Sequence, residues 1–315
     1  DVVKKSGYKA GDTLKLILPF LKAYGATNQA IKEYSANSIV VVPGAVFSLK
    51  YIRNILPSFI ISTSYEQYLN ALCDFIGFDK GHVYCTKLDI DRYELEADEI
   101  NRLKEIREEI DSLPTLDIAS YVHHFNNFPL AVKKTVKRLD GFFWEEMASM
   151  KSSEILNGIN PIGGHEKANA ILHSLEMTGG DLNNVMYVGD SITDIQAMNL
   201  VRTHGGLAVS FNGNRYAVRE ADITCISGNA CITSILADVF SKEGKDGVME
   251  MAMNWSHHTM KTCGAEQILI DQLFLLHRES FPQVEVVKEG NKERLIEESE
   301  VFRKTIRGEE VGELG

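Results

Sequence analysis

The amino-acid sequence predicts an α/β fold: a doubly wound parallel sheet of Rossmann-like form with α-helical cap insertions. Two observations lead to this prediction. Short apolar runs alternate with amphipathic helical segments over residues 41–96 and 158–240, which is typical of parallel strands joined by crossover helices. Between these stretches, residues 97–157 show helical periodicity without the alternation that marks a half-buried strand.

The composition limits the classes of partner. The 315 residues can bury a large core, and an apolar content of 44% is ordinary for a globular protein. The formal net charge of -11 argues against nucleic acid and anionic membranes, which both require clustered Lys and Arg. No apolar run approaches the roughly 18 residues of a membrane span. Five cysteines without a CxxC pair fit reduced thiols, so we expect a cytoplasmic protein that is not embedded in a membrane.

The pattern of elements divides the chain into five parts. We expect a helical cap segment at 1–40, a first part of the core at 41–96, a helical insertion at 97–157, a second part of the core at 158–240 and a mostly helical C-terminal extension at 241–315. Strands are expected at 58–63, 82–90, 184–188, 206–211 and 223–226, with one candidate strand at 284–287. The first expected helices are 12–24, 27–38, 42–55 and 65–76.

Two carboxylates follow the expected strand at 184–188, in the stretch VMYVGDSITDIQAM. Asp190 comes one Gly after the strand, at the carboxyl end where ligands bind in open parallel sheets. Asp194 lies one helical turn later and can share the same face. Two such acids with Ser191 between them suit Mg²⁺, which is held by few protein ligands together with water and a substrate phosphate. The alternative is simple capping of the helix that follows.

Further polar residues stand at other strand and helix ends. Ser62 and Thr63 close the expected strand 58–63, so their hydroxyls and the nearby backbone N–H groups could bind a phosphate or merely cap a helix. Lys167 lies early in a helix, where its charge opposes the helix dipole, which points to a role outside the helix; the alternative is an ordinary solvated surface Lys. Asn212, in FNGN after the strand 206–211, lies at another carboxyl end of a strand; Asn-Gly is first of all a turn signal, and an indirect part in the site is the alternative.

These motifs resemble those of the haloacid-dehalogenase-like hydrolases. The stretches PGAVFSLKYI…IISTS, KANAI and VGDSITDIQAM are similar to the second, third and fourth motifs of that superfamily, over roughly residues 40–90 and 160–240. The resemblance implies a Rossmann-like hydrolase core in which Ser62 and Lys167 hold a phosphoryl group while Asp190 and Asp194 anchor Mg²⁺. It also implies that the loop of Ser191 and Asn212 faces the substrate. The sequence is most similar to an archaeal branch often labelled energy-converting hydrogenase A, subunit R.

One part of the family pattern is missing from the sequence. The family nucleophile is the first Asp of a DxD-type motif that ends a first strand, and no such strand precedes Asp12. The DxD at Asp89-Ile90-Asp91 follows the second motif, where an Asp more often begins a turn. We therefore expect the nucleophile's strand to lie upstream of Asp1.

Two hypotheses follow. The first is a Mg²⁺-dependent phosphatase that hydrolyses a small phosphorylated metabolite, a phosphate ester, through an aspartyl-phosphate, with the cap segments excluding water and selecting the substrate. The second is a non-catalytic accessory or regulatory protein on the same scaffold, associated with a hydrogenase complex. The set of Ser62, Lys167 and Asp190 favours the first hypothesis, and the missing nucleophile favours the second.

Overall fold

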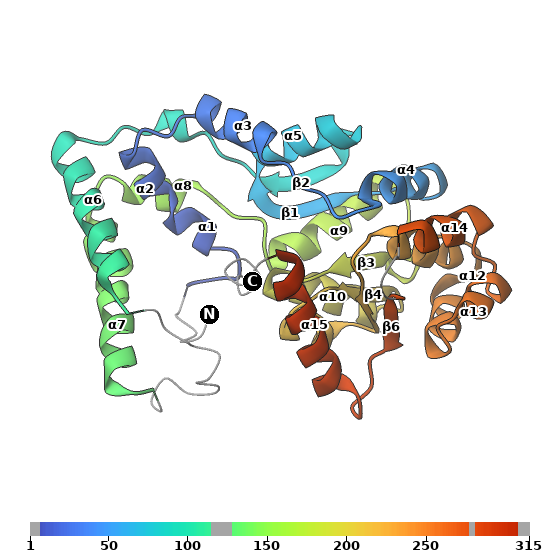
Figure 1. Ribbon diagram of the computed structural model, residues 1–315. Coiled ribbons are helices and arrows are strands. Elements are labelled where there is room, and N and C mark those ends of the chain that lie inside the picture. The colour runs from blue at the N-terminus through green and yellow to red at the C-terminus, as the bar shows by residue number, and fades with distance from the viewer. Residues whose placement is uncertain (1–6, 115–127, 277–280, 308–315) are drawn as a thin grey trace. The chain divides into compact units, whose positions relative to one another are not determined.

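The computed structural model describes residues 7–114, 128–276 and 281–307 (Figure 1). The chain forms two compact units, and each is described here by itself. The first unit comprises Asp1–Ile39, Ser62–Lys80 and Cys85–Gly163, and the second comprises Val40–Ile61, Gly81–Tyr84 and Gly164–Gly315. The five-part division expected from the sequence stays a prediction.

The second unit contains a four-stranded sheet in the order β3-β4-β5-β6. The strands are β3 (Met186–Gly189), β4 (Leu207–Phe211), β5 (Ile223–Ile226) and β6 (Gln283–Val286). The first three run parallel, whereas β6 is antiparallel to β5 and forms one edge. In the register of β3 and β4, Gly189 lies opposite Ser210, so both strands end at the same level.

Helices cover both faces of this sheet because successive strand side chains point to opposite sides. Leu207 and Val209 of β4 enter a core formed with α12 (Cys231–Met253) and α14 (Gln267–Leu276), on which α4 (Ala45–Ile55) packs. Ala208 enters the opposite core, formed with α9 (His165–Thr178), α10 (Ile195–Thr203) and α11 (Arg215–Glu220). This arrangement confirms the doubly wound α/β fold.

The C-terminal part of the chain belongs to the second unit. After α13 (His257–Thr262) and α14 the chain forms β6 and then α15 (Lys292–Arg307). Helix α15 packs against α11, where Leu295 and Ile296 are buried against Val218. The last turns of α15 are therefore fixed relative to the loop that precedes α11.

The first unit is mainly helical. Its helices are α1 (Thr13–Leu16), α2 (Leu18–Ala23), α3 (Asn28–Asn37), α5 (Glu66–Ile76), α6 (Ala97–Ser112), α7 (Leu130–Asp140) and α8 (Ser153–Gly158). The single helix expected at 12–24 is wrong, because the helix breaks at Ile17. The cause is Pro19, which lacks the N–H that would bond to the carbonyl of Lys15 in a continuous helix.

Strands β1 (Ile60–Tyr65) and β2 (Val83–Thr86) form a separate two-stranded sheet. Strand β1 begins two residues later than the expected 58–63 and continues to Tyr65, directly before α5. Within the described ranges, β3 has β4 as its one neighbouring strand, and its other edge is unpaired.

Two further expectations concern membrane-spanning segments and the state of the cysteines. In the described part of the chain, no helix combines the length and the apolar character needed to cross a lipid bilayer. All five cysteines are free thiols, and four of them are buried.

Gly244 provides a test of the fold. It lies inside α12 with φ 65° and ψ -161°, a conformation that glycine alone adopts without strain. A Cβ there would meet no atom within 4 Å, so Gly244→Ala should lower the free energy of unfolding through backbone strain alone, by about 1–3 kcal/mol.

The matched control is Gly141→Ala. Gly141 also has open space for a Cβ, but its φ of -59° is helical. This substitution should raise the free energy of unfolding by about 0.5–1 kcal/mol. Denaturant unfolding of both variants measures the difference, and an equal change in both would contradict the assigned backbone of Gly244.

Candidate active site

Asp190 stands at the carboxyl end of β3, where the chain turns toward α10. The turn depends on Gly189, because a Cβ at that position would lie 2.7 Å from Cβ of Asp194 and 3.1 Å from Sδ of Met198. Only a glycine therefore leaves the space in which the Asp194 side chain packs against the end of β3. The local sequence Gly-Asp-Ser places the two acids differently, with Asp190 partly exposed and Asp194 buried.

The carboxylate of Asp194 is saturated by donors from its own unit. Oδ1 accepts hydrogen bonds from Lys167 Nζ and from the hydroxyl of Tyr187, each at 2.7 Å. Oδ2 accepts from the backbone N–H of Asp190 at 3.2 Å, from the N–H of Ser191 at 3.1 Å and from its hydroxyl at 3.2 Å. Asp194 is only 3% exposed, and its hydrogen bonds hold the turn after β3 to the start of α9.

These contacts determine the charge states of Asp194 and Tyr187. Burial alone would raise the pKa of Asp194, but the charge of Lys167 and the hydrogen bonds from Lys167 and Tyr187 together bring that pKa below its usual value. Burial, together with the nearby Asp194 charge, raises the pKa of Tyr187 well above its usual value. At neutral pH Asp194 is therefore ionised, and Tyr187 is a neutral hydrogen-bond donor.

Lys167 occupies the first turn of α9 and is only 5% exposed. Its position near the positive end of the helix dipole is unfavourable, and the ion pair with Asp194 offsets that cost. A buried ammonium with a fixed partner presents its charge at a defined point, which a mobile surface lysine cannot do.

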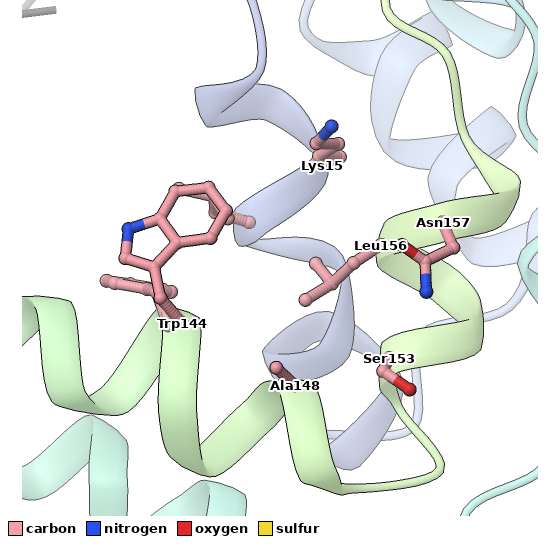
Figure 2. A pocket seen from close by; sticks show the side chains of 8 residues that line it. Lys15, Trp144, Ala148, Ser153, Leu156 and Asn157 are labelled. Atoms are coloured by element: carbon pink, nitrogen blue, oxygen red, sulfur yellow. The ribbon is translucent and has the colours of Figure 1, made fainter. Parts of the chain in front are cut away.

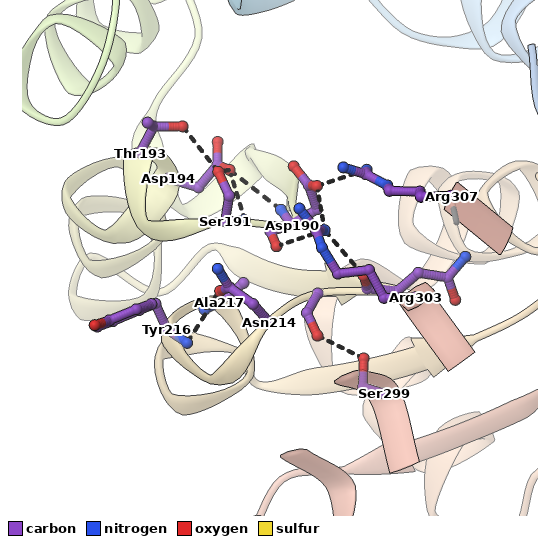
Figure 3. A network of polar contacts seen from close by, with 12 residues as sticks. Asp190, Ser191, Thr193, Asp194, Asn214, Tyr216, Ala217, Ser299, Arg303 and Arg307 are labelled. Atoms are coloured by element: carbon purple, nitrogen blue, oxygen red, sulfur yellow. Dashed lines mark hydrogen bonds and ion pairs between the residues drawn. The ribbon is translucent and has the colours of Figure 1, made fainter. Parts of the chain in front are cut away.

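Asp190 itself is held by two arginines of α15 (Figure 3). Its Oδ2 accepts from Arg303 Nη1 at 2.6 Å and from Arg307 Nη2 at 2.7 Å. The Arg303 side chain is 2% exposed and that of Arg307 is 39% exposed. In the described part of the chain no group contacts Oδ1 of Asp190, whose side chain is 34% exposed.

Arg303 also joins two strand-end loops. Its Nη1 donates to the backbone carbonyls of Asp190 and Asn212, each at 3.2 Å. Asn212 adopts a left-handed backbone with φ 48°, and its side-chain amide exchanges hydrogen bonds with the backbone of Ser227 at 2.8 and 2.9 Å. Its side chain therefore holds the loop after β4 to the loop after β5, and its expected indirect role in the site stays a prediction.

Further contacts anchor α15 in place. Ser299 donates to the carbonyl of Gly213 at 2.6 Å (Figure 3). Arg215 forms a two-pronged ion pair with Glu300 at 3.0 and 3.1 Å. Sequence reasoning missed the two arginines because basic residues in a last helical turn ordinarily complement the helix dipole.

The hydroxyl residues of the expected phosphate site lie in the first unit. Ser62 and Thr63 lie inside β1, so the expectation that they end the strand and begin a helix is wrong. The strand continues for two residues, and α5 begins at Glu66. Ser62 Oγ accepts from the N–H of Ser64 at 3.2 Å, whereas Thr63 Oγ1 is buried without a hydrogen-bond partner in the described part of the chain.

A second polar residue that sequence reasoning missed lies near Thr63. Asp12 is buried, its Oδ2 accepts from the N–H of Lys9 at 3.1 Å and pairs with Lys15 at 3.2 Å, and its Oδ1 has no partner among the described residues. A Cβ on neighbouring Gly11 would lie 2.9 Å from the Thr63 methyl group. The loop of Asp12 therefore packs directly on β1.

The acids of the DxD sequence have a local structural task. Both oxygens of Asp91 accept from the N–H of Asn28 at 3.2 Å, and Asp89 Oδ1 accepts from its side-chain amide at 2.6 Å. Asn28 is the first residue of α3. Asp91 thus binds the backbone at the start of α3, and Asp89 binds the Asn28 side chain, so both carboxylates have a structural partner.

The first unit also has a small pocket (Figure 2). It is lined by Lys15, Leu16, Phe143, Trp144, Ala148, Ser153, Leu156 and Asn157. The indole of Trp144 and the aliphatic side chains make it largely apolar, and Lys15 adds a cation at its edge. The residues that line this pocket suit an apolar group better than a phosphate.

The residues offer a metal ion a limited set of ligands. In the described ranges no three His, Cys, Asp or Glu residues converge in a way that could hold a metal. Asp190 Oδ1 fits one ligand position for Mg²⁺, which takes few protein ligands and completes its shell with water and phosphate. Both oxygens of Asp194 are occupied by donors, so its expected metal contact stays a prediction.

The structure brings Lys167, Asp190, Ser191, Asp194 and Asn212 together at the carboxyl end of the sheet in the second unit. The model of the haloacid dehalogenase-like hydrolase family matches residues 17–231, more than half of the chain. The chain is similar to a solved structure of a gene product from Archaeoglobus fulgidus, with a TM-score of 0.78, 26% identity and coverage of 99% of this chain and 84% of that chain. No curated protein matches it. The extent of the family match shows that the chain belongs to the haloacid dehalogenase-like hydrolases.

Proposed function

We propose that the protein is a Mg²⁺-dependent phosphatase that hydrolyses a small phosphorylated metabolite through an aspartyl-phosphate. The observation that supports this most is the buried pair of Lys167 and Asp194, which fixes an ammonium at the same strand end as the partly exposed carboxylate of Asp190. A fixed cation beside an open carboxylate oxygen suits a phosphate and its metal ion. Membership of a hydrolase family supports the general class of reaction.

Each residue has a distinct task in this proposal. Lys167 offsets the negative charge that develops on the phosphoryl oxygens, and Asp194 keeps it in place. Asp190 offers Oδ1 to Mg²⁺, which when bound neutralises phosphate charge. The expected phosphate contacts of Ser62 and Thr63, which belong to the first unit, stay a prediction.

The nucleophile is the one part that the proposal assigns to no described residue. Asp89 and Asp91 both bind Asn28, and Asp194 is saturated by its donors. The edge of β3 that has no strand partner in the described ranges offers a place for a further strand. A parallel strand there would end beside Asp190 and could present a carboxylate to the phosphorus.

The accessory or regulatory role is the second candidate. It is favoured by the engagement of Asp190 Oδ2 with two arginines, which makes this carboxylate a structural counter-ion as well as a candidate ligand. A phosphatase assay with and without Mg²⁺ separates the two candidates. A cytoplasmic location, a phosphate ester as substrate, the cap role of the helical segments and an association with a hydrogenase all stay predictions.

Asp190→Asn should abolish Mg²⁺-dependent hydrolysis of p-nitrophenyl phosphate. The substitution removes an anionic ligand for the metal, and it also takes a charged acceptor from buried Arg303. We therefore expect a loss of stability of about 1.5–3 kcal/mol, because hydrogen bonds to charged groups have that magnitude. The fold should not be left untouched, in contrast to what the sequence alone suggests for a residue at a strand end.

The control for this variant is Asp181→Asn, at an exposed acid that precedes β3 by a few residues. It should leave both turnover and unfolding unchanged. Undiminished Mg²⁺-dependent turnover by folded Asp190→Asn protein would end the metal assignment.

Lys167→Ala should lower kcat by roughly 10²–10³-fold, because a fixed cation aimed at developing charge acts mainly in the transition state. Steady-state kinetics on the same ester measures kcat and KM separately. A rise in KM at constant kcat would show that Lys167 contributes uniform binding, and its catalytic role would be withdrawn.

Lys245→Ala provides the matched control. Lys245 pairs with Asp222 at 2.9 Å and donates to the carbonyl of Gly206 at 2.8 Å, just before β4 begins. That position is at the opposite end of the sheet from Asp190. Loss of this second Lys–Asp pair should affect stability while kcat stays unchanged.

A further inference from the structure

Arg307, the last residue of α15, has N–H donors that no described residue accepts from. Among the described residues its one polar partner is Asp190, whose Oδ2 accepts from Nη2 at 2.7 Å. A guanidinium has five N–H donors in a rigid fork, so Nε and Nη1 remain available. The side chain is 39% exposed, so part of it is accessible to a ligand.

The charges around Arg307 favour an anion. Arg303 and Arg307 both contact the same oxygen of Asp190, so their two positive groups are close neighbours. Among the described residues, the strand end joins Lys167, Arg303 and Arg307 with the two carboxylates Asp190 and Asp194. These three cations exceed the two anions by one charge.

The position of Arg307 in the fold also favours binding of an anion. The carboxyl end of a parallel sheet is where ligands bind in this fold class, and Arg307 reaches it by holding Asp190. Arginine recognises phosphate through paired N–H donors, which gives geometric specificity as well as charge. Helix α15 lies beyond residues 17–231, so the family match assigns it no role.

We propose that Arg307 is an anion-binding residue that holds the phosphoryl group of the ligand beside Asp190. Arg303 is the positioning residue of this pair, because it is buried and ties the carboxylate to the loop of Asn212. The ligand class is a phosphate monoester or phosphate itself. The proposal rests on the proposed function for the identity of that ligand, and it extends the site to a helix that contributes no catalytic motif.

The test is titration of the full chain with inorganic phosphate in a calorimeter. Measurements are made in EDTA and again with Mg²⁺, at an ionic strength held constant with chloride. Arg307→Gln should weaken phosphate binding by about tenfold to a hundredfold, the range expected for the loss of a hydrogen bond to a charged group. Arg307→Lys keeps the charge without the fork, so its loss should be smaller.

Arg294→Gln is the matched control. Arg294 lies on the same helix, and its side chain is 47% exposed. It pairs with Glu285 and Glu298 and not with Asp190. This variant should bind phosphate as the wild type does. Unchanged melting temperatures for the Arg307 variants would show that the effect is not one of folding.

Two results would overturn the proposal: no phosphate binding by the wild type, or equal affinity of Arg307→Gln and wild type. Failure of the proposed function gives a different result. Binding that depends on Arg307 without any ester hydrolysis would remove the phosphatase and keep the anion site. Hydrolysis with unchanged kcat/KM in Arg307→Gln would keep the phosphatase and remove the anion site.

Discussion

The buried ion pair between Lys167 and Asp194 is the interaction on which the rest of the candidate site depends. It links the start of α9 to the turn after β3, and Gly189 leaves the space in which the Asp194 side chain fits. A buried charge whose partner is removed costs several kcal/mol. The two residues therefore have to stay together, and the turn that carries Asp190 and Ser191 is fixed through the same carboxylate.

A second layer of order comes from α15. Arg303 and Arg307 converge on one oxygen of Asp190, and Arg303 also reaches the loop of Asn212. One oxygen of Asp190 is thereby engaged with the protein, while no described residue contacts the other, which the proposal assigns to a ligand. This division explains how a residue can be a counter-ion for arginine and a candidate ligand for Mg²⁺ at the same time.

The charge pattern separates the two candidate functions. A phosphatase needs cations to receive a phosphate and an open carboxylate to share a metal ion, and the strand end offers both. It also needs a carboxylate nucleophile, and the described acids that the sequence suggested for it, Asp89 and Asp91, are committed to Asn28. The edge of β3 that lacks a strand partner in the described ranges is the feature that reconciles these findings with a hydrolase.

The sequence by itself determined the fold class, the parallel strands β3 to β5 and the grouping of Lys167, Asp190 and Asp194, because apolar periodicity and the order of motifs are local or regularly spaced properties. Only the tertiary structure decided that Asp194 is saturated while Asp190 is open, that Ser62 and Thr63 lie within β1, and that α15 supplies two arginines. The contacts of α15 join residues more than a hundred positions apart, as Asp190 and Arg303 do, and the donors to Asp194 include Lys167, which lies in another helix. Local periodicity indicates which face of a helix is buried, but the packing of α15 on α11 selects what its last turn contacts.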